Sequence, residues 1–434
     1  MSVLPEPAST RWRASRWIAA AAALAVVVAM AGALASTGGE SGLDPALGHA
    51  LFQRAWVSAP ASTRSTDGLG PLYNARSCAA CHGAARRLPT DAAGQAVPSA
   101  ILFKLEGPRG PDPTYGAQLQ TAGVHGLPAE GRVQVAWQEI PVALADGRTV
   151  SLRKPSYRLV DPGYGPLDPA TLLSPRVPPS LAGAGLLERI DAAAILAGAA
   201  EEQARGGAGH PGRPAACTGK PDCVGRFGWK ANAATVDDQV SLAFSLDLGL
   251  STTLHPAPWG DCTPREAACV TAPHGADPAT GETEIAPALL SLVDAFVRGR
   301  PPPPRHEPDG ALVAAGAAVF ADAGCGACHR PSFTIAAADG GSQTIAPYSD
   351  LLLHDLGPGL SDAPGIAGDW RTAPLWGLGM IERSTAQAYL HDGRARSLEE
   401  AILWHGGEAM PSQRAAKALT ADQWDALLAF LRSL

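Results

Sequence analysis

Two segments of the chain, residues 78–82 and 325–329, share one pattern: two cysteines three positions apart and a histidine directly after the second cysteine. This spacing allows two thiols to bond to two vinyl groups of one porphyrin, while the histidine presents its imidazole to the iron. The alternative is a pair of zinc half-sites or dithiols, but two matches in one chain favour two covalently bound c-type haems. The predicted attachment residues are Cys78, Cys81, Cys325 and Cys328, and the predicted iron ligands are His82 and His329.

The N-terminus has the pattern of an export signal. Three arginines, Arg11, Arg13 and Arg16, precede an uncharged run over residues 17–35, which ends in small residues typical of signal-peptide cleavage. We therefore expect residues 1–35 to be a signal peptide and the folded part to be periplasmic. The run is also long enough to span a bilayer, so the alternative is an N-terminal anchor, and only then would a membrane be a partner.

The other four cysteines do not have the haem pattern. They are Cys217, Cys223, Cys262 and Cys269, with spacings of six and seven residues inside Gly- and Pro-rich stretches. Disulfides persist in exported proteins, and these spacings favour two local disulfides in surface loops. Crossed pairing is the alternative that the sequence leaves open.

A proline-rich stretch within residues 299–310 predicts a stiff linker between two haem domains. The N-terminal domain would span residues 36–298 and the C-terminal domain residues 311–434. In the C-terminal part, an apolar segment precedes the haem motif, and a capping box at Thr420 opens a helix that runs to the chain end. We therefore expect a mainly α fold of two cytochrome c-type domains, the first enlarged by loops and a hairpin near residues 133–157.

Composition excludes several functional classes. The net charge is −7, and no basic cluster follows the first 16 residues, so nucleic-acid binding has no electrostatic support. Hydrophobic residues make up 46% of the chain and charged residues 17%, which argues against a largely disordered protein. The single long apolar run argues against a membrane protein with several spans.

Two helix starts, one in each half of the chain, can be placed in register. Thr235 and Ser397 are each followed three residues later by an acidic residue, which is the pattern of a helix N-cap. The residue eight positions after Ser397 is His405, whereas the residue eight positions after Thr235 is Ala243. Because residues four apart share one helix face, we expect these two residues to take equivalent places toward the two haems.

This comparison predicts two different haem sites. His405 can be the sixth ligand of the second iron, which gives a closed haem suited to electron transfer, although a histidine of the core is the alternative. Ala243 cannot bind iron, so the first haem would keep the open position that peroxide or oxygen requires. Gln239 and Asp247, one helical turn to either side of Ala243, would line that position.

Several motifs resemble those of one bacterial family. They are DGLGPLYN at 67–74, GRFGWK at 225–230, YSDLLLHD at 348–355, WRTAPLWG at 370–377 and HDGR at 391–394. On these motifs the chain is identified as a member of the di-haem oxidoreductases, also described as thiol oxidoreductases and related to the di-haem cytochrome c peroxidases. The resemblance covers nearly all of the mature chain. It implies two haem domains close enough for electron transfer and a calcium ion between the two halves.

The resemblance also implies roles for single residues. Trp229, ten residues before Gln239, matches a tryptophan that relays electrons between the haems of the peroxidases. Gln239 matches their distal glutamine, whereas Asp247 stands two residues earlier than their distal glutamate and is shorter. His405 departs from the methionine of the peroxidases and from the tyrosine of a protein-modifying relative. The peroxidases also have a histidine that caps the first haem at rest, and His125 is the candidate for that role here.

Other residues have competing interpretations. His391 is predicted to line a haem edge or to bond a propionate, with a structural role as the alternative. His354, Met380 and Met410 are rival iron ligands or ordinary packing residues. Plain structural roles, in core packing, helix capping or a solvated helix end, are the alternatives for Trp229, Gln239 and Asp247.

The sequence therefore predicts an exported di-haem c-type cytochrome that acts as a peroxidase-like oxidoreductase. Peroxide or oxygen would react at the N-terminal haem, with Gln239, Asp247 and Trp229 as catalytic residues. Electrons would pass through the C-terminal haem from a redox partner protein. The alternatives are a non-enzymatic electron carrier with two closed haems and an oxygenase or protein-modifying oxidase on the same scaffold.

Overall fold

The computed structural model of the chain describes residues 44–62, 67–82, 101–205, 212–277, 282–306, 310–337, 339–361, 368–382 and 388–434. The predicted signal segment, residues 1–35, lies outside them, as do residues 307–309 of the predicted linker. Residues 45–434 form one compact unit, and the predicted boundary between two haem domains stays a prediction. No helix in the described ranges is long and apolar enough to cross a membrane.

The expectation of a mainly α fold is wrong, because the structure is 32% helical and 21% strand. The α-helices are α2 (Asp44–Gln53), α3 (Cys78–Cys81), α4 (Ala184–Glu188), α5 (Ala192–Arg205), α6 (Val236–Leu248), α7 (Ala267–Val270), α8 (Pro287–Arg298), α9 (Ala311–Asp322), α10 (Leu378–Glu382), α11 (Leu398–Trp404), α12 (Met410–Lys417) and α13 (Ala421–Ser433), with short 3-10 helices η2 (Cys325–Ala327) and η3 (Gly407–Ala409). The strands are β1 (Leu72–Tyr73), β2 (Leu102–Glu106), β3 (Ala122–Gly123), β4 (Arg132–Ala143), β5 (Thr149–Val160), β6 (Leu172–Arg176), β7 (Ala216–Cys217), β8 (Lys220–Val224), β9 (Phe333–Ala336), β10 (Ser342–Ile345), β11 (Leu353–Asp355) and β12 (Asp369–Arg371). They pair antiparallel in twos, as β1–β3, β2–β6, β4–β5, β7–β8, β9–β10 and β11–β12. Except for β4 and β5, these strands have two to five residues, too few for an alternating pattern to be visible in the sequence.

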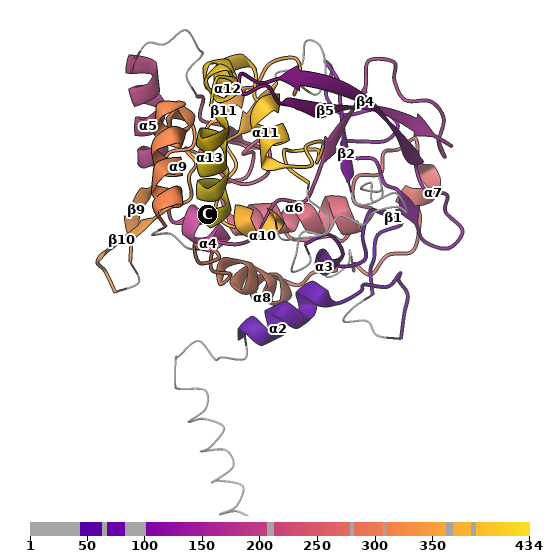
Figure 1. Ribbon diagram of the computed structural model, residues 1–434. Helices are drawn as coiled ribbons and strands as arrows, with labels where there is room; N and C mark the ends of the chain where they lie inside the picture. Colours follow the sequence, from indigo (N-terminus) through magenta and orange to yellow (C-terminus); the bar gives the residue numbers. More distant parts are fainter. Residues whose placement is uncertain are drawn as a thin grey trace, which may run out of the picture. The chain divides into compact units, whose positions relative to one another are not determined.

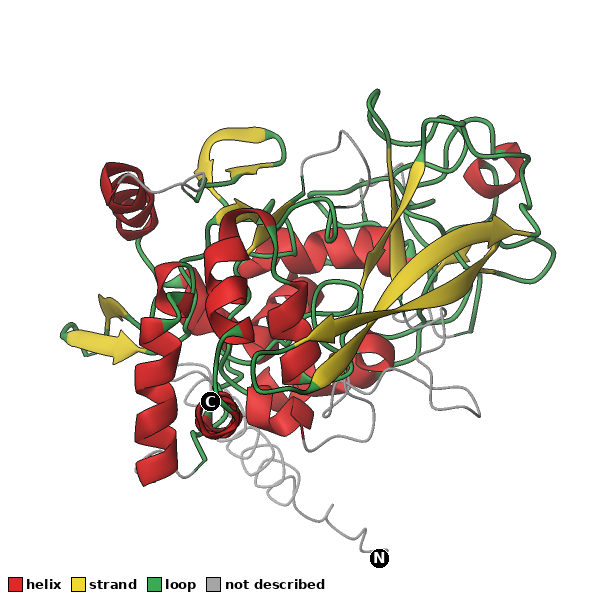
Figure 2. Cartoon of the chain, turned by 45° about the horizontal axis from the view of Figure 1, so that its top comes forward, coloured by secondary structure: helices red, strands yellow, loops and turns green. Residues whose placement is uncertain are grey.

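The hairpin expected near residues 133–157 is confirmed. β4 and β5 pair along all twelve residues of each strand, and Figure 2 shows this long hairpin beside the group of helices. Its turn contains Gly147, whose φ of 89° is a left-handed conformation that glycine adopts without strain. The hairpin belongs to the N-terminal half but reaches the C-terminal half, where Arg148 Nη1 donates to Glu399 Oε1 at 2.8 Å.

The predicted helix N-caps are confirmed. The side-chain oxygens of Thr235, Ser397 and Thr420 accept hydrogen bonds from the backbone N–H three residues later, at 3.0, 3.1 and 3.3 Å. Each bond satisfies one of the N–H groups that the start of a helix leaves unpaired. Residues at equal distances from the caps of α6 and α11 therefore occupy comparable positions up to Trp404, the last residue of α11, which His405 follows as the C-cap.

Two hydrophobic clusters hold the helices together. The first combines residues of α2, α4, α6 and α8, and the second combines residues of α9, α11 and α13 with Leu144 and Leu152 of the long hairpin. α9 and α13 lie side by side (Figure 1). The two helices can approach closely because Gly316 has no side chain. A Cβ at this position would overlap the carbonyl oxygen of Ala426.

Both local disulfides expected from the cysteine spacing are present. They join Cys217 to Cys223 and Cys262 to Cys269, so the alternative of crossed pairing is excluded. The first disulfide connects β7 to β8, and the second ties a loop to α7. The four cysteines of the haem motifs are not disulfide-bonded.

Two glutamates of the N-terminal half are buried beside each other and have no basic partner in the described part of the chain. Glu130 and Glu266 are both 0% exposed. Glu130 Oε2 accepts a hydrogen bond from Gln120 N at 2.6 Å, and Glu266 Oε2 accepts one from Thr263 N at 2.9 Å. Burial and the neighbouring charge of Glu266 raise the pKa of Glu130, so its carboxyl keeps a proton that the unfolded chain has already lost.

We expect the free energy of unfolding to fall as pH rises above 4.5, the ordinary pKa of glutamate, because the folded chain retains the Glu130 proton and the unfolded chain releases it. One such proton lowers the free energy of unfolding by about 1.4 kcal/mol per pH unit until the pH reaches the pKa of the folded state. Glu130→Gln is uncharged at every pH, so its unfolding free energy, measured by urea denaturation between about pH 5 and 8, should fall less steeply. The control Glu282→Gln removes an exposed carboxylate and should follow the wild type. Equal slopes for Glu130→Gln and the wild type would contradict this prediction.

Candidate functional site

The second haem motif borders a cavity of about 340 Å³ that is lined mainly by apolar side chains. Gly324, with a φ of 76°, turns the chain from α9 into η2, and Cys325, Cys328 and His329 all line the cavity. Burial raises the pKa of the Cys325 thiol to about 11. Two thiols beside a mainly apolar cavity fit the attachment of a porphyrin.

Two imidazoles face each other across this cavity. The ring centroids of His329 and His405 are 6.4 Å apart. With metal–nitrogen bonds of about 2 Å and centroids about 1 Å behind the nitrogens, two imidazoles on opposite sides of one metal have centroids about 6 Å apart. Nδ1 of His329 donates to the carbonyl oxygen of Tyr348 at 3.0 Å, and Nδ1 of His405 donates to that of Ala401 at 2.7 Å. Each ring therefore leaves Nε2 directed away from its carbonyl partner, and together the two imidazoles would hold one haem iron.

The first haem motif has a comparable local arrangement. α3 carries its two cysteines, and the following His82 donates from Nδ1 to the carbonyl oxygen of Pro179 at 3.1 Å. The same kind of bond, from Nδ1 to a carbonyl oxygen, orients the ring of His329. Burial, and then the charge of Asp247, raise the pKa of both thiols to about 12. Residues 83–100, which follow the motif, lie outside the described ranges.

α6 carries the predicted distal residues Gln239, Ala243 and Asp247 at four-residue intervals. The charge of Asp247 acts on both cysteines of the first motif, which places the C-terminal end of α6 near that motif. Asp247 Oδ1 accepts a hydrogen bond from Gln118 Nε2 at 2.9 Å, and burial raises the pKa of its carboxyl. Gln239 lines the same cavity as the second haem motif, and Pro179, whose carbonyl oxygen is bonded to His82, lines it as well. The buried Oε1 of Gln239 has no hydrogen-bond partner among the described residues. The methyl group of Ala243 offers no ligand atom.

Trp229 and His391 lie at the same cavity, together with a second tryptophan. Trp229 Nε1 donates to the carbonyl oxygen of Val177 at 2.7 Å, which fixes the indole. His391 stacks on Trp370 with ring centroids 3.6 Å apart, and it meets the edge of Trp229 at 6.4 Å. All three rings line the cavity. Trp370 is the first residue of the motif at residues 370–377, but nothing in the sequence marks it as a cavity residue.

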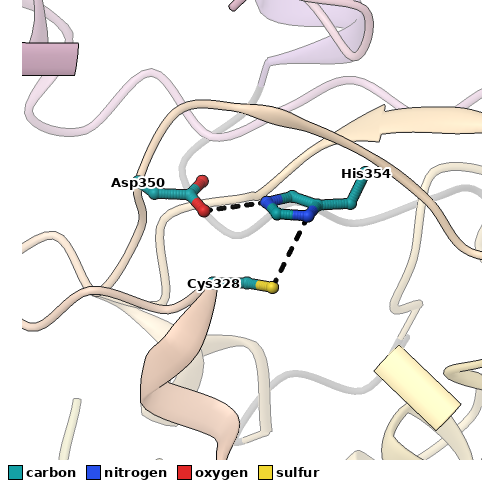
Figure 3. A group of neighbouring side chains, drawn as sticks. All are labelled: Cys328, Asp350 and His354. Atoms are coloured by element: carbon teal, nitrogen blue, oxygen red, sulfur yellow. Dashed lines mark hydrogen bonds and ion pairs between the residues drawn. The ribbon is translucent and has the colours of Figure 1, made fainter. Parts of the chain in front are cut away.

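Figure 3 shows a buried group beside Cys328. His354 Nε2 lies 2.8 Å from Asp350 Oδ2, and Nδ1 lies 2.9 Å from Glu408 Oε2 and 3.7 Å from Cys328 Sγ. Burial disfavours the charged ring, but hydrogen bonds to these three partners outweigh it and raise the pKa of His354 to about 12. The three side chains drawn in Figure 3 are close enough to hold a metal ion. Both ring nitrogens of His354 are, however, engaged by carboxylates, so the geometry favours a supporting role over the predicted rival ligand.

The remaining alternatives receive no support from the geometry. Met380 and Met410 are 47% and 40% exposed, which does not suit a ligand of a buried iron. His125 lies exposed on the turn after β3, and its capping role stays a prediction. The calcium ion between the two halves also stays a prediction.

The sequence was compared with known proteins. A family model described as "Di-haem oxidoreductase, putative peroxidase" matches residues 110–434. This range contains 325 of the 434 residues, among them the second haem motif, α6 and α11, while the first haem motif precedes it. No protein with a curated description matches the chain.

Replacing His405 tests the axial pair. In His405→Ala the second iron would keep only His329, so its ferric signal should change from low-spin to high-spin, as measured by near-infrared magnetic circular dichroism. Added imidazole should restore the low-spin signal, because it can occupy the emptied position. The exposed His49→Ala is the control and should keep the wild-type spectrum. A low-spin signal that survives unchanged in His405→Ala would exclude His405 as a ligand.

Proposed function

The chain belongs to the di-haem oxidoreductase family, and from this premise we propose that it is an exported, periplasmic, peroxidase-like c-type cytochrome. Peroxide or oxygen reacts on the side of His82. Electrons from a redox partner protein enter on the side of His329 and His405. When bound, the two haem irons supply the redox chemistry, and the polypeptide supplies ligands, orientation and electrostatics. The proposed attachment residues are Cys78, Cys81, Cys325 and Cys328.

The observation that carries this proposal is a difference between two helices with matched N-caps. Eight residues after the cap, the chain has Ala243 in α6 and His405 at the end of α11. His405 lies opposite His329 at a distance that fits one iron, so this site is closed to an oxidant. In this proposal Ala243 faces the site of His82, and because it has no donor atom, that site keeps a position at which peroxide can bind.

Gln239 is suited to hold the oxidant. Its Oε1 is buried without a partner in the described part of the chain, and an unpaired buried oxygen is costly. A peroxide O–H that donates a hydrogen bond to this oxygen removes that cost. We therefore assign Gln239 the orientation of the peroxide.

Asp247 is suited to hold and deliver a proton. Burial raises the pKa of its carboxyl, against the opposing effect of the Lys104 charge and the hydrogen bond from Gln118. The carboxyl consequently keeps its proton to a higher pH than an exposed aspartate does. The hydrogen bond from Gln118 Nε2 also fixes its orientation. In this proposal Asp247 acts as a general acid toward the departing oxygen of peroxide.

In this proposal Trp229 connects the two sides. Its indole lines the cavity that His329 and His405 share, and its Nε1 is bonded to the carbonyl oxygen of Val177. Its own carbonyl oxygen accepts a hydrogen bond from the backbone N–H of Arg371 at 2.9 Å. These two bonds hold the indole between segments of both halves, as an electron relay requires.

Ala243→His tests the open site. The new imidazole should occupy the open position as His405 does in the other half, so the rate of reaction with H₂O₂, measured by stopped-flow absorption, should fall to the background level. An unchanged rate would overturn the open site. Two closed haems in the wild type would instead favour the electron carrier, and peroxide use that requires a protein substrate would favour the protein-modifying oxidase.

Gln239→Ala tests the positioning of peroxide. The rate constant should fall by about 100-fold, a typical cost of removing one positioned hydrogen-bonding group, while the spin states stay the same. Gln413 offers a matched control, because it lines the same cavity but donates from Nε2 to the carbonyl oxygen of Leu403 at 2.6 Å. Gln413→Ala should react as the wild type does. A wild-type rate in Gln239→Ala would remove Gln239 from the proposed mechanism.

A further inference from the structure

Arg371 connects the two halves of the chain next to Trp229. It is the last residue of β12, and its backbone N–H donates to the carbonyl oxygen of Trp229. Its side chain donates from Nε to the carbonyl oxygen of Gly228 at 2.9 Å and from Nη1 to that of Thr372 at 3.2 Å. The residue is only 6% exposed, and it lines the same cavity as His329.

The charge of Arg371 has no carboxylate partner among the described residues. Its side-chain hydrogen bonds go to neutral carbonyl oxygens, and Nη2 makes none with the described residues. Asp350, whose charge reaches Arg371, is already bound to His354 at 2.8 Å. Burial lowers the pKa of Arg371 to about 10. A buried guanidinium without an anion is costly, so the position calls for an anion that the described side chains do not supply.

The cavity indicates the chemical class of that anion. Its walls include the thiols of Cys325 and Cys328 and two imidazoles whose spacing fits one iron. A haem fits this set of groups, and every haem carries two propionate carboxylates. Arginine is well suited to a buried carboxylate, because its planar fork offers parallel N–H groups and stays charged.

We propose that Arg371 binds a propionate of the haem attached at Cys325 and Cys328. This assignment rests on the proposed haem attachment and not on the reaction with peroxide. Because the same guanidinium is bonded to Gly228 and the backbone of Arg371 to Trp229, the salt bridge would also fix Trp229 relative to the haem. A cation at the propionate favours the ferrous form and so raises the midpoint potential of this haem.

The other charged groups near this position are accounted for. Arg176 and Lys230 lie over the ring of Trp370, at 4.5 and 3.8 Å from its centroid, and Lys230 Nζ also donates to the carbonyl oxygen of Asp369. Neither of them lines the cavity, and Arg176 also pairs with Glu106 at 3.2 Å, so Arg371 is the cation of this part of the wall among the described residues. His391, stacked on Trp370, is the neighbouring titratable ring.

Three variants of the holoprotein test the assignment: Arg371→Gln, Arg371→Lys and Arg226→Gln. Resonance Raman spectroscopy measures the propionate bending mode, and spectroelectrochemistry measures the midpoint potential of the low-spin haem. Arg371→Gln should shift the mode and lower the potential, while Arg371→Lys keeps the charge and should lower the potential less. Arg226→Gln is the matched control and should leave both at wild-type values. Arg226 is buried in the same cavity wall and its Nε has no hydrogen-bond partner among the described residues, but both of its Nη atoms donate to carbonyl oxygens of Val224, Ala234 and Ile190. The carboxylates of Glu188 and Asp191 also act on its charge, so it does not need the anion that Arg371 lacks.

An unchanged mode and potential in Arg371→Gln with both haems attached would overturn the assignment. Equal changes in Arg371→Gln and Arg371→Lys would also overturn it, because they indicate a purely structural role of the carbonyl bonds. If the Arg371→Gln protein does not fold with both haems attached, the propionate mode of Arg371→Lys tests the assignment instead. A lysine pairs with a carboxylate in a different geometry from arginine, so the mode should shift. A shifted mode in that fully loaded variant supports the salt bridge, and an unshifted mode contradicts it. Neither readout involves peroxide, so this assignment and the peroxidase function can fail separately.

Discussion

The imidazoles of His329 and His405, each fixed by a hydrogen bond from Nδ1 to a carbonyl oxygen, form the contact on which the rest of this structure depends. His329 lies in the loop after α9, and His405 lies at the end of α11. The two rings keep the distance that fits one iron only if these two segments are held in place relative to each other. The second hydrophobic cluster meets this requirement, because α9 packs on α13 and the long hairpin packs on α11. A hairpin of the N-terminal half thus helps to hold a site of the C-terminal half.

The proposed function depends on how the two halves differ. Both have a histidine whose Nδ1 is bonded to a carbonyl oxygen, and within the described part of the chain an opposing imidazole, His405, is seen in the second half. Trp229 is bonded to Val177 through its indole and to Arg371 through its carbonyl oxygen, so its position is fixed. Gln239, in contrast, has an unpaired buried oxygen. In the proposed function, the fixed indole of Trp229 carries electrons, and the unpaired amide oxygen of Gln239 is available to bind the peroxide.

Much of the site could be predicted because its signals are local in the sequence. The cysteine–histidine spacing, the caps at Thr235 and Ser397 and the two short disulfide loops each involve residues a few positions apart. The strand content could not be predicted, because pairs such as β2–β6 and β11–β12 join strands of three to five residues from separate loops. The partners of His354 were hidden for the same reason, since Glu408 lies 54 residues away along the chain. The export signal and the redox partner stay predictions.

In the arrangement that we propose, one iron is open and the other is closed. Low-temperature EPR of the ferric wild-type protein tests this difference most directly, because a single imidazole leaves iron high-spin and two opposing imidazoles make it low-spin. We predict one high-spin and one low-spin signal of equal intensity, with only the high-spin signal changing when fluoride is added. Two low-spin signals, neither of which responds to fluoride, would contradict the open site.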